Sequence, residues 1–209
     1  MQLDINTLMP NNYLEFGTAL GATIVGAVVY FFRWKKKRKE AYNIEYWKTH
    51  SDIHEALTEL RLQCDAARTQ LVQFHNGEYF IDGISMKKLS MTHESLHSGV
   101  SAQYNKLREV LISMFIEHVQ SLISEIVVIR KIGQIKSSIF KQILESDNVE
   151  AYMAVTIKNK GKITGYIMVQ WCNRVTFETI DIESCKKAIE RAKDSIEVSL
   201  LQQKATDER

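Results

Sequence analysis

Residues 93–97 read HESLH, an HExxH pattern with the right residue types for metal chemistry. On a helix, two histidines at this spacing bind Zn²⁺ through their ring nitrogens, and the glutamate activates the metal-bound water. A third ligand is needed, and Glu117 follows on a segment whose periodicity predicts a helix. A zinc metalloprotease that uses His93, His97 and Glu117 as metal ligands is therefore one candidate function.

The residues around the pattern oppose a zinc-binding helix there. Ser98 and Gly99 follow it directly, and the segment before it alternates in polarity as a strand does. Ser95 also stands inside the pattern, where a zinc helix commonly has an apolar pair. We therefore keep the protease as the alternative, predict no catalytic residues and no cofactor, and expect zinc only if the alternative holds.

Other candidates for chemistry are weaker. His50 and His54 are one helical turn apart, but without a third ligand a solvated helix face is the simpler interpretation. The three cysteines, Cys64, Cys172 and Cys185, include no CxxC pair, which excludes a disulfide framework and favours a reducing compartment. The sequence has no P-loop, no dinucleotide-binding glycine pattern and no GxSxG motif.

The elements that must position these residues belong to an α+β domain. Hydrophobic residues make up 45% of the 209 residues and charged residues 25%, which excludes wholesale disorder. Periodicity and turn residues predict this order: a helix over 40–67, a strand over 69–75, a hairpin turn at Asn76-Gly77, strands within 78–91, a helix over 101–123, a strand over 125–132, a short helix, a hairpin with its turn at 159–162, and a final helix from about Asp181.

The first part of the chain has the character of a membrane span. Residues 16–32 carry no charge, which is close to the minimum length for crossing a bilayer, so we expect a transmembrane helix over 13–34 after a short extracytoplasmic N-terminus at 1–12. A secretory signal peptide would need basic residues before the apolar run, and only acidic ones precede it. Small residues at GxxxG-like spacing favour packing between such helices: Gly17, Gly21, Ala22 and Gly26.

A basic run follows directly, with six basic residues within positions 33–39 of a chain whose net charge is only +2: Arg33, Lys35, Lys36, Lys37, Arg38 and Lys39. Basic residues mark the cytoplasmic side of a span, so we expect a single-pass protein of the inner (cytoplasmic) membrane with its N-terminus outside and the run on anionic lipids. No aromatic residues interleave with it as in a nucleic-acid surface, so no specific nucleic-acid partner is expected. We assign 35–67 to the run and connecting helix, 68–203 to the cytoplasmic domain, and 204–209 to a frayed tail.

From about residue 52 to 201 the chain resembles a GAF domain, a small ligand-sensing fold related to PAS domains. The resemblance rests on QFHNGEYFIDGISMKKLSMTHES at 73–95, on SGVS at 98–101, and on the hairpin MAVTIKNKGKITGYIMVQW at 153–171 before the final helix. Similar GAF-like domains occur in uncharacterised proteins of tailed phages and bacteria. A role at a host membrane during infection is what that likeness suggests.

The resemblance implies an antiparallel sheet flanked by helices, a small molecule on one sheet face, and dimerisation through the first and last helices. The sequence lacks the NKFDE-type signature of cyclic-nucleotide-binding members and a recognisable cysteine for chromophore attachment, so the ligand stays unknown. As residues that bind a ligand or hold a loop we single out His75, Asn76, Gly77, Glu78, Ser90, His93, Glu94 and Trp171.

Together these patterns predict a membrane-anchored cytoplasmic GAF-like sensor or interaction module that forms homo-oligomers, contacts a protein partner at the membrane and is not an enzyme. Besides the zinc protease, a ligand-free structural scaffold and a pore-associated membrane protein remain open.

Overall fold

The computed structural model describes residues 12–79 and 85–207, with side chains described for 26–37, 44–77 and 87–202. The chain divides into two units, residues 1–46 and residues 47–209. Helix α1 (Asn12–Gln63) contributes residues to both units. The predicted span at 13–34 and the predicted connecting helix therefore belong to one uninterrupted helix.

The described part of the first unit, residues 12–46, is the earlier part of α1. Within the part of the chain that the structure describes, no helix has both the length and the apolar character needed to cross a membrane. The packing around Gly17, Gly21 and Ala22 lies outside what the structure describes. The same holds for the side chains of Arg38 and Lys39. Gly26, the fourth small residue predicted to pack, has no neighbouring atom within 4 Å of the position of an added Cβ.

Large apolar side chains of the first unit are exposed, by between 44% and 73% of their surface: Val28, Val29, Tyr30, Phe31, Phe32 and Trp34. Arg33, Lys35, Lys36 and Lys37 are exposed as well. The ammonium of Lys35 lies 5.0 Å from the centre of the Phe31 ring, a cation–π contact.

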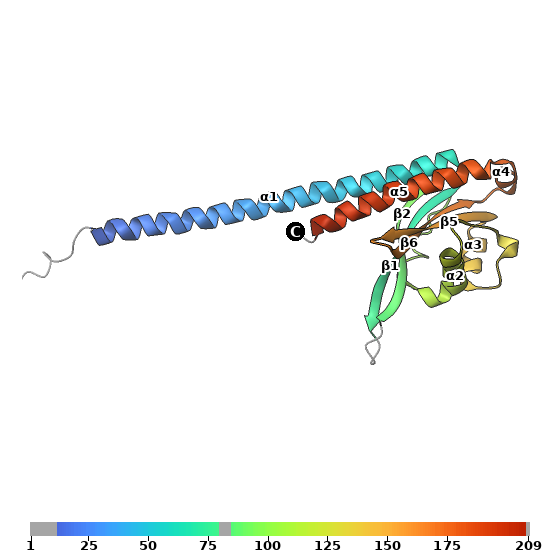
Figure 1. Cartoon of the computed structure of the whole chain (residues 1–209), viewed down its shortest axis with the longest axis horizontal. Coiled ribbons are helices and arrows are strands. Elements are labelled where there is room, and N and C mark those ends of the chain that lie inside the picture. The colour runs from blue at the N-terminus through green and yellow to red at the C-terminus, as the bar shows by residue number, and fades with distance from the viewer. Residues whose placement is uncertain (1–11, 80–84, 208–209) are drawn as a thin grey trace, which may run out of the picture. The chain divides into compact units, whose positions relative to one another are not determined.

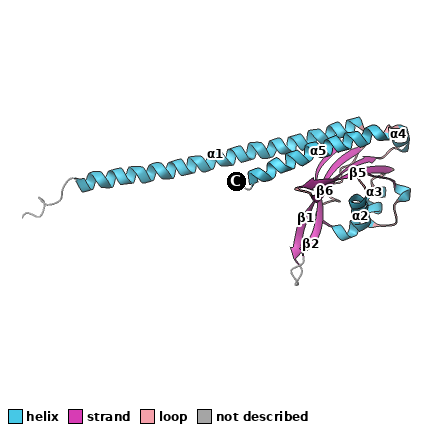
Figure 2. Cartoon of the chain, viewed as in Figure 1, coloured by secondary structure: helices cyan, strands magenta, loops and turns pink. Residues whose placement is uncertain are grey.

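The second unit is built on an antiparallel sheet of six strands (Figures 1 and 2). The strands are β1 (Arg68–Tyr79), β2 (Ser85–Leu96), β3 (Val110–Leu111), β4 (Val128–Lys131), β5 (Ala151–Asn159) and β6 (Lys162–Trp171). Their order is β3-β2-β1-β6-β5-β4, so β1 and β6 join two hairpins at the centre of the sheet.

Helices cover both faces of the sheet. On one face lie the end of α1 and helix α5 (Ile182–Asp207), side by side in Figure 1 and packed into one core with the sheet. On the other face lie α2 (Ile116–Ser124) and α3 (Ile139–Ser146). A short helix, α4 (Arg174–Thr179), connects β6 to α5. We call the two sides the α1/α5 face and the α2/α3 face.

Two apolar stripes at helical spacing form the core of the α1/α5 face. The first follows the end of α1 and is buried: Ile53, Leu57, Leu60 and Cys64. The stripe on α5 is buried too: Cys185, Ile189, Ala192 and Ile196. These side chains pack on the inward residues of the central strands, so the end of α1 and α5 share one core.

Two local predictions are wrong. Asn76-Gly77 does not form a hairpin turn, because β1 continues through it to Tyr79 and Asn76 pairs with Lys87 of β2. Residues 101–123 do not form one helix, because 101–109 run as turns and bends before β3 and a 3₁₀ turn at Ile112–Phe115. Helix α2 begins only at Ile116.

Candidate functional site

An open cleft lies on the α2/α3 face, at the end of the sheet where β1 ends and β2 begins. Its volume is about 390 Å³. Strands β1, β2, β5 and β6 supply part of its lining, and α2 supplies another part. The apolar residues of the lining are Phe74, Ile112, Val119, Leu122, Ile123 and Ile163. A cleft of this size and composition suits a small molecule with an apolar body.

The polar lining of the cleft is dominated by one cation. Lys87 is exposed, and its ammonium donates a 2.6 Å hydrogen bond to the side-chain oxygen of Asn76. Thr156 and Thr164 add two hydroxyl groups. No aspartate or glutamate occurs among the described residues that line this cleft. The cleft can therefore take an anionic group beside Lys87 without repulsion from a neighbouring carboxylate.

His75 also lines the cleft, but both of its ring nitrogens have partners within the protein. Nε2 lies 2.9 Å from the Ser90 hydroxyl, and Nδ1 lies 3.2 Å from the backbone oxygen of Asn76. The Ser90 oxygen accepts a 2.8 Å bond from the backbone N–H of Glu109. The Ser90 hydroxyl can then donate its hydrogen to His75 Nε2. The ring proton of His75 therefore lies on Nδ1, which donates it to the backbone oxygen of Asn76. His75 and Ser90 thus hold the end of the 97–109 loop.

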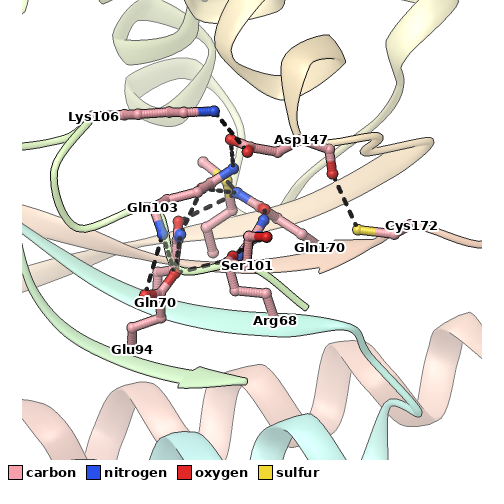
Figure 3. Close-up of polar contacts among 10 residues, drawn as sticks. Arg68, Gln70, Glu94, Ser101, Gln103, Lys106, Asp147, Gln170 and Cys172 are labelled. Atoms are coloured by element: carbon pink, nitrogen blue, oxygen red, sulfur yellow. Dashed lines mark hydrogen bonds and ion pairs between the residues drawn. The ribbon is translucent and has the colours of Figure 1, made fainter. Parts of the chain in front are cut away.

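A buried polar network occupies the other end of the same face (Figure 3). Arg68 is 1% exposed, and its Nε lies 3.2 Å from a carboxylate oxygen of Glu94. Arg68 also donates to the Gln170 side chain at 2.5 Å and to the backbone oxygen of Ser101. The ion pair joins β1 to β2, and the two further bonds extend it to β6 and to the loop.

Gln103 is the centre of this network (Figure 3). Its side-chain oxygen accepts bonds from Gln70 at 2.6 Å and from Gln170 at 3.3 Å, and its side-chain nitrogen donates to Asp147 at 2.6 Å. Its backbone N–H donates to Glu94 at 3.1 Å. Lys106 adds a 2.7 Å ion pair to Asp147. The network therefore fixes the loop across the sheet.

Between the cleft and the network, aromatic side chains fill the face. His118 is buried, stacks on Phe140 with ring centres 4.2 Å apart, and meets Tyr152 and Tyr166 edge-on. Burial lowers the pKa of His118 to about 3, so its ring is neutral at neutral pH. Burial likewise raises the pKa of Tyr152 to about 12. Three of these rings, His118, Phe140 and Tyr152, also line a second open cavity of about 750 Å³ between α2 and α3 on this face.

The HExxH pattern does not form a zinc-binding helix. His93 and Glu94 lie on strand β2, and successive side chains of a strand point to opposite faces. His93 contacts His50 of α1, with Nε2 and Nδ1 2.7 Å apart, whereas Glu94 joins the network on the other face. Burial, then the neighbouring histidines, lower the pKa of His93 to about 4.

The other proposed zinc ligands do not join His93. His97 lies beyond the end of β2 and is exposed, and Glu117 lies in the first turn of α2. Within the described ranges, no group of three or more histidine, cysteine, aspartate or glutamate side chains is placed to hold a metal ion. The geometry that the protease alternative requires is therefore not formed among these residues.

The remaining residues that were predicted to form the site do not lie together in the structure. Gly77 is part of β1, and the side chain of Glu78 lies outside the described residues. Trp171 is buried in the α1/α5 core, where its ring nitrogen donates to the backbone oxygen of Cys64 at 2.9 Å. It does not line the cleft with His75 and Asn76.

Sequence reasoning missed the contribution of α2 and of Lys87 to the cleft. From the sequence alone, Lys87 and Lys88 are equivalent members of a small basic cluster on a strand. The two lysines differ in the structure because Lys87 pairs with Asn76 of β1. That register depends on a bulge at Thr92, which lies between the Leu71–His93 and Val72–Met91 pairs. No local signal marks that bulge.

Comparison with solved structures identifies the fold. The phycocyanobilin-bound GAF domain of a cyanobacterial phytochrome matches with a TM-score of 0.56 at 12% identity, over 82% of this chain and 98% of that one. The GAF domain of a two-component sensor histidine kinase from Bacillus halodurans matches with a TM-score of 0.54 at 14% identity, over 76% and 97%. The phycoerythrobilin-bound GAF domain of a cyanobacterial phytochrome matches with a TM-score of 0.53 at 12% identity, over 81% and 97%.

No protein-family profile matches the chain, and no curated protein matches it. Likeness at such low identity shows the fold alone. The chain therefore has an α+β GAF-like fold, as the sequence predicted, and what it binds must be argued from its own residues.

Proposed function

We propose that this protein is a non-enzymatic sensor module whose GAF-like domain binds a small amphiphilic anion in the cleft on its α2/α3 face. The cleft carries this proposal, because it combines apolar walls with a single lysine and has no carboxylate among its described lining residues. The anionic group would lie beside Lys87 and the apolar body between α2 and the strands. A bound ligand would contact α2, and through this contact the domain would transmit the presence of the ligand.

Decanoate and decanol are suitable probes, because they share an apolar chain and differ in charge. We expect decanoate to bind the full chain, and Lys87→Ala to weaken it roughly tenfold, which corresponds to about 1.4 kcal/mol for one charge-assisted contact. Decanol binding should not depend on Lys87. Isothermal titration calorimetry measures both affinities on the full chain, transferred from detergent into an amphipathic polymer so that no micelles compete for the probes.

Lys88 provides the matched control. It is the next residue on β2, it pairs with Glu109 at 3.5 Å, and it does not line the cleft. Lys88→Ala should leave decanoate affinity within twofold of the original. The proposal fails if neither probe binds, or if the two lysine variants weaken decanoate equally.

The same proposal places the domain at the cytoplasmic face of a membrane, attached through the first part of α1. It is supported by the uncharged run at 16–32, by the exposed apolar side chains from Val28 to Trp34, and by the basic residues beside them. Extraction of membranes with alkaline carbonate tests it. An integral protein stays in the membrane pellet, and release of the chain into the supernatant would refute the attachment.

Self-association through α1 and α5 completes the proposal. An open groove of about 760 Å³ runs between the two helices within the second unit. Apolar residues from both helices line it, among them Ala56, Leu60, Ala192 and Val198. A second copy of the chain could pack its own helix pair there.

A further inference from the structure

Two histidine rings meet where α1 enters the second unit, which begins at residue 47. His50 of α1 and His93 of β2 are stacked, with ring centres 4.8 Å apart and ring planes inclined by 23°. Nδ1 of His50 lies 2.7 Å from Nε2 of His93, although the two residues are 43 positions apart in sequence. At this distance one ring donates an N–H and the other ring must supply a lone pair. We call this pair the histidine contact.

Two further hydrogen bonds join α1 to β2, and both lie further along the helix. The hydroxyl of Thr58 is 3.0 Å from that of Ser95, and Nε of Arg61 donates to the same Ser95 hydroxyl at 3.2 Å. Between these bonds and the histidine contact, Ile53 is fully buried and anchors α1 in the core. The histidine contact therefore attaches to β2 the turn of α1 that precedes this anchor, residues 47–52.

We propose that the histidine contact is a proton-sensitive switch, which holds residues 47–52 of α1 on β2 while at least one ring is neutral and releases them when both rings are protonated. A neutral pair, or a pair that carries one proton, still has a lone pair to accept the hydrogen bond. A doubly protonated pair has only N–H donors at the contact, and two like charges face each other. The switch requires neither the ligand nor the membrane attachment proposed above.

The charged groups of α1 near the contact do not relieve this repulsion. His54 is one helical turn from His50, and its charge acts on His93 in the same direction as that of His50. Lys48, Asp52 and Glu55 line the groove on the side of α5. The titratable neighbour on the helix therefore adds to the effect of a second proton.

The sheet places neutral groups against His93. Its Nδ1 lies 3.1 Å from the hydroxyl of Thr92, and its cross-strand partner on β1 is the apolar Leu71. Glu94 follows directly on β2, but its carboxylate pairs with Arg68 on the opposite face of the sheet. A proton on His93 is thus not neutralised by the adjacent carboxylate.

The surroundings set the pH range of the switch. Burial lowers the pKa of His50, and burial, then His50 and His54, lower the pKa of His93 from 6.5 to about 4. A released ring in solvent has its ordinary pKa, so the contact is strongest above about pH 6.5 and weakens as the pH falls towards 4. Between pH 7.5 and pH 5, proton uptake by His93 alone favours release by a factor of roughly 30.

The test measures the accessibility of Thr49, which is 3% exposed within the turn to be released. Thr49→Cys and, as an exposed reference, Lys48→Cys are made separately in the full chain in detergent. Mass spectrometry follows the reaction of each position with methyl methanethiosulfonate. Dividing the rate at position 49 by the rate at position 48 removes the intrinsic pH dependence of a thiol. We expect this ratio to rise at least tenfold between pH 7.5 and pH 5.

Replacing both rings, by His50→Gln together with His93→Gln, keeps polar side chains that can bond to each other but removes the titration. In that background the ratio should stay within twofold over the same pH range. His97→Gln is the matched control, because His97 is exposed beyond the end of β2, and its chain should respond as the original does. A flat ratio in the original chain, or a rise that persists without the two rings, would overturn the proposal.

A second measurement uses the unaltered chain and needs no cysteine. Deuterium exchange at the imidazole carbon between the two ring nitrogens, followed by mass spectrometry, gives the titration of each histidine. We expect His93 to be half-protonated near pH 4, and this pH to move upward in His50→Gln. If the titration of His93 were the same with and without His50, the two rings would titrate independently and the switch would be refuted.

Discussion

Gln103 shows how a single buried side chain can determine the path of a loop. It is fully buried, and its amide bonds to residues that are 33, 44 and 67 positions away. Because its backbone N–H is also bonded, to Glu94, the loop is held at this point by both its main chain and its side chain. A segment with helical periodicity consequently stays irregular from residue 101 to 109.

Glu94 is the charged partner on which this arrangement depends. Glu94→Gln keeps the shape of the side chain but leaves the buried Arg68 without its counter-ion. We expect a loss of roughly 3 kcal/mol in the free energy of unfolding, the usual scale for breaking a buried ion pair on one side. Urea denaturation of the full chain measures this loss.

Glu125→Gln is the control at the same scale. Its partner Arg130 and Glu125 itself are each about a third exposed, so their pairing should contribute less than about 1 kcal/mol. If Glu94→Gln and Glu125→Gln lowered the free energy of unfolding equally, the buried network would contribute no more to stability than a partly exposed ion pair.

At the scale of elements, the central strands β1 and β6 approach unusually closely at one position. Gly165 pairs with Gln73, and a Cβ added to Gly165 would lie 2.1 Å from the backbone oxygen of Val72. No rotamer change can relieve a clash with backbone. A side chain at this position must therefore push the two strands apart.

Gly165→Ala should cost at least about 3 kcal/mol in the free energy of unfolding, at the upper end of the range for overpacked sites. Gly133→Ala is the matched substitution, because an added Cβ there meets nothing within 4 Å, and it should change stability by no more than about 0.5 kcal/mol. Chemical denaturation compares the two. A Gly165 variant as stable as the Gly133 variant would contradict the close approach.

The elements also show which parts of the fold the sequence could predict. The β5–β6 hairpin was predicted because its turn is local: Lys160 and Gly161 both take positive φ, as a two-residue turn requires. The end of α1 and helix α5 were predicted because helical periodicity is local too, and the apolar residues that carry it are buried.

The failures come from long-range contacts. Asn76-Gly77 resembles a turn, but cross-strand pairing extends β1 beyond it. The cleft combines two strand pairs with α2, and the network combines residues up to 102 positions apart, so neither has a sequence signature. The sequence singled out His75 and Ser90, and in the structure both make loop contacts, so Lys87 is the cation of the cleft lining that the proposed ligand would meet.

At the scale of the whole molecule, the self-association proposed above uses the groove between α1 and α5. Val198 lines this groove and is 53% exposed, whereas most of the other lining residues are polar or charged. If two copies associate there, Val198 becomes buried between them. A charge at this position would then have to be desolvated on association.

We expect the detergent-solubilised full chain to be dimeric by light scattering, and Val198→Glu to shift it to the monomer. Val175→Glu serves as the control, since Val175 is 67% exposed on α4 and lies outside the groove. A monomeric starting chain, or dissociation by both variants, would exclude the groove as the interface.

The strand order has a consequence for how the protein is made. The centre of the sheet joins β1, at residues 68–79, to β6, at residues 162–171. All of residues 80–161 must therefore be synthesised before the central pair can form. Until then the first hairpin has an unpaired edge, and closing so long a loop is a slow step in folding. Helix α1 precedes both strands in the chain, so it leaves the ribosome well before the domain has a core and is available to a membrane or a chaperone.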